Sequence, residues 1–126
     1  MGEVLAVGAT TSDNRFMYRV VVNEAVLDEI VRRLVEAVDP DRIILFGSRA
    51  RGDHRPDSDV DLLLVKPSSA PPHRRVIPAY QAMAGLLVPT EILWRTPDEI
   101  EDWSQVGSHF TTRALREGRV LYEKQR

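Results

Sequence analysis

Cysteine is absent from the 126-residue chain, which excludes disulfide bonds and metal sites built from thiolates. The three histidines are scattered and match no zinc-binding spacing. No apolar run approaches the ~20 residues of a membrane-spanning helix, so no membrane partner is expected. The N-terminal stretch lacks the basic start of a secretory signal, and a cytoplasmic protein is therefore expected.

An excess of positive charge is also absent, because the formal net charge is −2. That value argues against bulk attraction to nucleic acid or anionic lipid, so nucleic acid is not the expected partner. Apolar residues make up 43% of the chain and charged residues 29%, which is ordinary for a soluble globular protein. The length favours one domain that is large enough to bury a core.

The clearest local pattern is a helix predicted over residues 24–38, where apolar residues recur at helical spacing. Asn23 is its expected N-cap, and Asp39-Pro40 ends it. Apolar, β-branched runs predict strands over 42–46, 59–65 and 90–94. The connection between the first two strands is too short for a crossover helix, so they should pair antiparallel.

The later segments predict further helices. One is expected over residues 74–87, in which Pro78 either kinks the helix or marks its true first turn. Another opens at Asp98-Glu99, and a final helix stops at Gly118 before a short apolar run. The fold class is therefore α/β (α+β), with a small mixed sheet flanked by helices.

The two ends of the chain differ in content. Residues 1–22 are expected to form an N-terminal extension, either flexible or containing a short strand over 16–22. Residues 23–126 are expected to form the functional domain.

Two aspartates, Asp59 and Asp61, stand at the head of the second apolar run. In a strand, residues i and i+2 point to the same face about 7 Å apart, so these carboxylates should project side by side. Two bare carboxylates repel each other unless a cation intervenes. Magnesium is such a cation, because it takes carboxylate oxygens and substrate phosphates as ligands.

A Gly47-Ser48 turn ends the first apolar run. Backbone N–H groups in such turns can form anion-binding concavities, and glycine lets the backbone approach a ligand closely. Arg49 and Arg51 follow, each either solvated or neutralising phosphate, and Arg51 could equally pair with a nearby carboxylate. Phosphate donors beside a carboxylate pair indicate a metal–nucleotide site.

These motifs resemble those of the minimal nucleotidyltransferases (MNT), a family of the superfamily that shares the DNA polymerase beta catalytic fold. The resemblance rests on Gly47-Ser48-Arg49-Ala50-Arg51-Gly52 and on Ser58-Asp59-Val60-Asp61-Leu62. The family has a third carboxylate, usually Asp, on a later strand that runs into a Thr-Pro-acidic turn. Glu91 stands at that position here, before Thr96-Pro97-Asp98. The resemblance covers residues 24–123.

The resemblance implies a polymerase beta-like sheet with helices on one face. It implies that the catalytic and metal-binding residues are Asp59, Asp61 and Glu91, with two Mg²⁺ ions, and that the nucleotide-binding residues are Gly47, Ser48, Arg51 and Ser58. Glu91 is one methylene longer than Asp, which bears on the reaction rate more than on binding. The alternative for Glu91 is an exposed residue at a strand start.

The implied function is a Mg²⁺-dependent transfer of AMP from ATP to a hydroxyl of a partner protein. The protein would then be the antitoxin of a pair whose toxin is a small helical HEPN ribonuclease. Two alternatives stay open. One is a stoichiometric toxin binder with a weak or inactive nucleotide site, and the other is a small-molecule nucleotidyltransferase in which a homo-oligomer supplies the acceptor pocket. The sequence does not determine the acceptor, the base preference or the oligomeric state.

Overall fold

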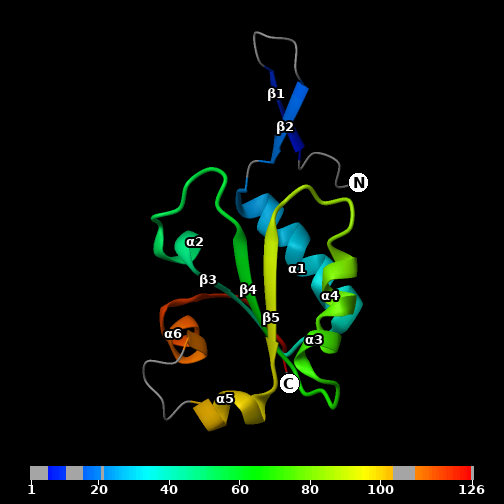
Figure 1. The fold of residues 1–126 in the computed structure, drawn as a ribbon, viewed down its shortest axis with the longest axis vertical. Helices are drawn as coiled ribbons and strands as arrows, with labels where there is room; N and C mark the ends of the chain where they lie inside the picture. The colour runs from blue at the N-terminus through cyan, green and yellow to red at the C-terminus, as the bar shows by residue number, and fades with distance from the viewer. Residues whose placement is uncertain (1–5, 11–15, 21, 104–109, 126) are drawn as a thin grey trace.

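A four-stranded sheet forms the centre of the computed structural model, which describes residues 6–10, 16–20, 22–103 and 110–125 (Figure 1). Its strands, in spatial order, are β5 (Thr90–Arg95), β4 (Val60–Val65), β3 (Arg42–Phe46) and β6 (Arg119–Glu123). Strand β3 pairs antiparallel with both β4 and β6, whereas β4 and β5 are parallel. The predicted mixed sheet and the predicted antiparallel β3–β4 pair are both confirmed.

Helix α1 (Glu24–Val38) has the bounds that its apolar spacing predicts. The side chain of Asn23 accepts a hydrogen bond from the Val26 N–H at 3.0 Å, which satisfies one of the free donors at the helix start. Asp39 ends the helix in the left-handed conformation. The apolar stripe of α1 packs on one face of the sheet, and its buried residues are Val26, Leu27, Ile30, Leu34 and Val38.

The helix expected over 74–87 is instead two short helices, so that prediction is wrong in its extent. Helix α3 (Pro72–Arg75) and helix α4 (Ile77–Ala82) meet at Val76, and Pro78 lies in the first turn of α4. This is the alternative in which proline marks a helix start, where its missing N–H costs nothing.

None of the helices in the described ranges is long and apolar enough to cross a bilayer.

Helices cover both faces of the sheet, so the expectation of helices on one face is wrong. Helices α1 and α4 pack on one face, while α5 (Pro97–Trp103) and α6 (Phe110–Glu117) lie over the other (Figure 1). A second apolar cluster lies between this face and its helices. It is formed by Ile44, Phe46, Leu63, Val65 and Ala114, with Leu93, Ile100 and Leu115 packed against it. Because β3 and β4 are apolar on both sides, both sides must be covered.

A two-stranded antiparallel sheet precedes α1. Its strands are β1 (Ala6–Thr10) and β2 (Phe16–Val20), and it is separate from the four-stranded sheet. The short strand expected over 16–22 is confirmed over 16–20, whereas its partner β1 was not predicted. Figure 1 shows this hairpin extending away from the rest of the chain.

The end of β5 is fixed by a buried arginine. Arg75 is 7% exposed and donates hydrogen bonds to the carbonyl of Trp94 at 3.2 Å and to both carboxylate oxygens of Glu99 at 2.7 and 3.1 Å. Glu99 also accepts from the N–H of Thr96, whose hydroxyl accepts in turn from the Glu99 N–H. This reciprocal capping box starts α5.

Replacing Arg75 with glutamine should lower the free energy of unfolding by about 2 kcal/mol, because Glu99 and the Trp94 carbonyl lose a charged donor. The hydrogen bond from Arg75 holds the pKa of Glu99 below its ordinary value of 4.5. The stabilisation of the fold by the Arg75–Glu99 ion pair should therefore be complete above pH 4.5 and should decrease as the pH falls below it. Urea denaturation across this range is the measurement. Arg74→Gln, at an exposed neighbour, should change stability by less than about 0.5 kcal/mol.

Candidate active site

Two carboxylates lie side by side where β4 and β5 begin. Asp61 of β4 is in register with Glu91 of β5, and these strands are hydrogen-bonded neighbours. Side chains alternate along a strand, so Asp61 shares the sheet face of Leu63 and Val65, which α6 and α5 cover. Asp61 is therefore the polar end of an otherwise apolar face. Asp59 is exposed just before β4.

The surroundings of Asp61 favour its protonated form. Partial burial raises the pKa of Asp61 to about 6, and the negative charges of Glu91 and Asp59 and a hydrogen bond with Glu91 add to the rise. The positive charge of Arg51 opposes it. A proton shared between Asp61 and Glu91 thus relieves the repulsion between them. A bound cation could replace that proton.

The Gly47-Ser48 turn is packed directly against this carboxylate pair. Gly47 has φ 76° and ψ −157°, a backbone conformation that is essentially restricted to glycine. A Cβ added at Gly47 would overlap the carboxylate oxygen Oδ2 of Asp61. Helix α2 (Ser48–Arg51) starts here, and the first N–H groups of a helix have no partner within it. The turn therefore brings potential phosphate donors to the Asp61 carboxylate.

The two arginines of α2 have different roles. Arg49 donates hydrogen bonds to the carbonyls of Ser58, at 2.9 Å, and Pro56, at 3.1 Å, and so holds the loop before β4. The Ser58 hydroxyl accepts from the Arg55 N–H at 2.8 Å in the same loop. Arg51 is exposed, and its Nε lies 3.2 Å from Asp53 Oδ2. The alternative given for Arg51, pairing with a nearby carboxylate, is present, and the positive charge of Arg51 also acts on Asp61.

The glycine-serine turn and the carboxylate pair line a cleft with a volume of about 420 Å³. Of the residues predicted from the sequence, it brings together Gly47, Ser48, Arg51, Asp61 and Glu91. Within the described part of the chain, Ser58 and Asp59 lie outside its lining. The sequence did not indicate its other lining residues, which are Phe46, Arg113, Ala114 and Glu117. The only signal for Arg113 and Glu117 is their i, i+4 spacing, which is typical of any solvent-facing helix surface.

The donor set suits magnesium bound together with a substrate. Across residues 22–103 and 111–125, no three His, Cys, Asp or Glu side chains converge tightly enough to hold a metal ion by themselves. The described carboxylates instead form a pair, Asp61 and Glu91, with Asp59 near enough to influence Asp61. Magnesium is commonly bound by one or two carboxylates, with phosphates and water as its other ligands. The pair therefore fits a metal that arrives with a nucleotide.

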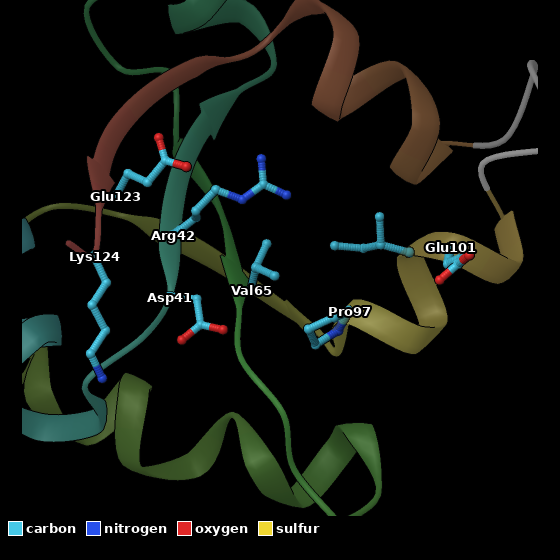
Figure 2. Close-up of a pocket in the computed structure, with 8 residues that line it drawn as sticks. Asp41, Arg42, Val65, Pro97, Glu101, Glu123 and Lys124 are labelled. Carbon is cyan, nitrogen blue, oxygen red and sulfur yellow. The ribbon is translucent and has the colours of Figure 1, made fainter. Parts of the chain in front are cut away.

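A second cleft, of about 290 Å³, lies near the opposite end of β3 and β4 (Figure 2). Its polar side chains come from several segments, and the carboxylates of Asp41, Glu101 and Glu123 are set apart from one another. Arg42 and Lys124 lie among them. This cleft lacks the adjacent carboxylate pair that marks the first one, which makes it the weaker candidate.

Gly47→Ala should displace Asp61 and destabilise the protein, because the new methyl group meets the Asp61 carboxylate and the backbone is strained at positive φ. Gly52→Ala is the matched control, since Gly52 also has positive φ, at 89°, but has open space around its Cβ position. The melting temperature should fall further for Gly47→Ala than for Gly52→Ala. An additional Asp61→Ala change should recover part of the melting temperature lost in Gly47→Ala. Equal losses in Gly47→Ala and Gly52→Ala would contradict the predicted overlap.

Asp61→Asn should raise the melting temperature of the protein at pH 7 to 8 in the presence of a chelator. The folded state holds the pKa of Asp61 at about 6, above its ordinary 3.8, so ionisation of Asp61 destabilises the fold as the pH rises through this interval. The asparagine amide carries no charge and can donate to Glu91. The difference in melting temperature between Asp61→Asn and the wild type should vanish below pH 3.8. Asp57→Asn, in the exposed loop, should show no such pH-dependent gain.

Comparisons with known structures agree on the fold. A candidate nucleotidyltransferase from Sulfolobus solfataricus is 20% identical, with a TM-score of 0.58 over 79% of each chain. A toxin–antitoxin structure with AMP-PNP is 19% identical, with a TM-score of 0.57 over 82% of this chain and 76% of that chain. A toxin–antitoxin MntA–HpeT mutant, in which two aspartates two positions apart are changed to glutamate, is 18% identical. Its TM-score is 0.55, over 82% of this chain and 75% of that chain.

Comparison with curated proteins gave no significant match. Comparison with protein-family models matched residues 27–117 to the nucleotidyltransferase domain. That range is most of the chain and contains the glycine-serine turn and all three predicted carboxylates. The chain therefore belongs to the nucleotidyltransferase domain family.

Proposed function

We propose that this protein transfers AMP from ATP to a hydroxyl group of a partner protein, as the antitoxin of a pair with a HEPN-type toxin. The observation that carries the proposal is the neighbouring pair Asp61 and Glu91, which faces the Gly47-Ser48 turn in one cleft. The structural neighbour solved with AMP-PNP supports an adenine nucleotide as the ligand. The two toxin–antitoxin neighbours support a protein partner.

In the proposed reaction, the acceptor hydroxyl oxygen attacks the α-phosphorus of ATP. The new O–P bond forms as the bond from the α-phosphorus to the bridging oxygen breaks, and pyrophosphate leaves with that electron pair. The hydroxyl proton passes to a carboxylate, and Glu91 is the exposed member of the pair. Bound Mg²⁺ would supply charge neutralisation at the phosphates.

The other site residues predicted from the sequence also have proposed parts. Asp61 would hold two Mg²⁺ ions together with Asp59 and Glu91, since the negative charges of those two carboxylates already act on Asp61. The N–H groups of the glycine-serine turn would bind phosphate, with Arg51 adding positive charge. Ser58 stays a proposed nucleotide-binding residue, since its hydroxyl accepts the Arg55 N–H and can still donate its own proton to phosphate.

A macromolecular acceptor fits the rim of the cleft. Glu91, Arg113 and Glu117 line it and are exposed, so a protruding side chain of a partner could reach the carboxylates. The connections over 53–57 and 66–72 are too short to form a lid domain. A tyrosine hydroxyl of the partner is a suitable nucleophile, because a nearby carboxylate and a cation lower the cost of its deprotonation.

A second candidate is a stoichiometric toxin binder whose nucleotide site turns over poorly. It is favoured by one observation, that no third carboxylate converges on the pair within the described residues. The longer side chain of Glu91, where the family usually has Asp, also favours the stoichiometric binder, because it would misplace the carboxylate oxygens. Formation of a covalent nucleotide adduct separates the two candidates.

The test is mass spectrometry of the product of the adjacent gene, after incubation with this protein, ATP and Mg²⁺. An AMP adduct should form with the wild type and disappear with Asp61→Asn, which loses a charge needed at the site. Glu91→Gln should slow adduct formation while nucleotide affinity stays within a few-fold, as expected for a group that acts in the transition state.

Asp57→Asn, at an exposed loop position, is the matched control and should react at the wild-type rate. Glu91→Asp would react faster than the wild type if the extra methylene is a handicap. A tight complex without any adduct would support the stoichiometric binder. Glu91→Gln that reacts as fast as the wild type would remove Glu91 from the chemistry.

A further inference from the structure

Helix α6 contributes a cation to the cleft that the roles above do not use. Arg113 is exposed and lines the cleft from α6, whereas Ser48 and Arg51 line it from α2. Its neighbour Ala114 is 6% exposed and packs into the second apolar cluster, so the helix is fixed against the sheet beside the cleft. Glu117, one helical turn further, lines the same cleft.

Among the residues that the structure describes, the Arg113 guanidinium has no partner. Other arginines have carboxylate partners, as Arg119 has in Glu24 at 2.8 Å and Arg51 has in Asp53 at 3.2 Å. The side chain of Arg113 makes no ion pair or hydrogen bond with any residue that the structure describes, not even with Glu117 at the i+4 position. An unengaged guanidinium is a ready partner for an anion, because binding breaks no existing contact.

Arg51 and Arg113 line the cleft from different helices, α2 and α6. Arg51 is the cation whose charge acts on Asp61, where the reacting phosphate of the proposed function belongs, and Arg113 is not among the groups that shift the pKa of Asp61. An extended anion that starts at the carboxylate pair and the glycine-serine turn would therefore meet Arg113 beyond the reacting phosphate.

We propose that Arg113 binds the β- and γ-phosphates of the nucleotide and thereby makes the site selective for a triphosphate over a monophosphate. This inference rests on the proposed function, because it assumes that a nucleotide occupies this cleft. A guanidinium suits the task because its planar set of donors can bind two phosphate oxygens together.

The experiment is calorimetric titration of the whole protein with ATP and with AMP, both in Mg²⁺. Arg113→Gln should bind ATP about tenfold more weakly, the loss expected for a charged hydrogen bond to phosphate, and should bind AMP as the wild type does. Arg113→Lys should recover part of the ATP affinity, because it keeps the charge without the paired donors. Arg116→Gln is the matched control, since Arg116 is exposed on the same helix and does not line the cleft.

Three results would overturn the inference. They are an unchanged ATP-to-AMP affinity ratio in Arg113→Gln, an equal loss for both nucleotides, and a loss of ATP binding in Arg116→Gln as large as that in Arg113→Gln. Failure of the wild type to bind ATP at all would instead overturn the proposed function, so the two failures are distinguishable. A melting curve for each variant shows that it is folded, which is expected because Arg113 is exposed.

Discussion

The site depends on the parallel pairing of β4 with β5, because this register holds Asp61 beside Glu91. Two carboxylates at neighbouring strand positions repel each other, and partial burial strengthens the effect. The pKa of Asp61, raised to about 6 by that burial and by Glu91, measures what the arrangement costs the fold near neutral pH. A cation bound between phosphate and carboxylate oxygens would remove the repulsion, so the cost to the fold and the capacity for metal binding have the same origin.

Helices on both faces of the sheet hold the starts of β4 and β5 in place. Helix α1 and helix α4 bury one side of the sheet, and α5 and α6 bury the other. The close approach of Gly47 to the Asp61 carboxylate then fixes the turn at the end of β3, where a larger residue would not fit. At the far end of β5, the buried Arg75 joins the strand to the start of α5. Rigid elements on all sides therefore position a polar site at the end of an apolar face.

The sequence predicts the elements whose signals are local, and it misses those that depend on tertiary packing. Helix α1 and strand β3 have the expected bounds, because a cap, a proline stop and unbroken apolar runs define them. Both faces of the sheet are covered because β3 and β4 are apolar at nearly every position, a pattern that the one-face expectation overlooked. The glycine-serine turn and Asp61 could be predicted to act together, but their direct contact could not. Arg113 could not be predicted, since an exposed arginine on a helix has no distinctive pattern and only the packing of α6 brings it to the cleft.

Binding of a metal–nucleotide complex at Asp61 can be tested by diffraction from crystals grown with Mn²⁺ and a non-hydrolysable ATP analogue, because Mn²⁺ is located by its anomalous signal. We expect an Mn²⁺ ion bound to the Asp61 carboxylate and to a phosphate oxygen of the analogue. We also expect the phosphates to lie against the Gly47-Ser48 turn. Mn²⁺ or nucleotide bound elsewhere, as in the cleft beside Asp41 and Pro97, with Asp61 free of metal, would contradict this expectation.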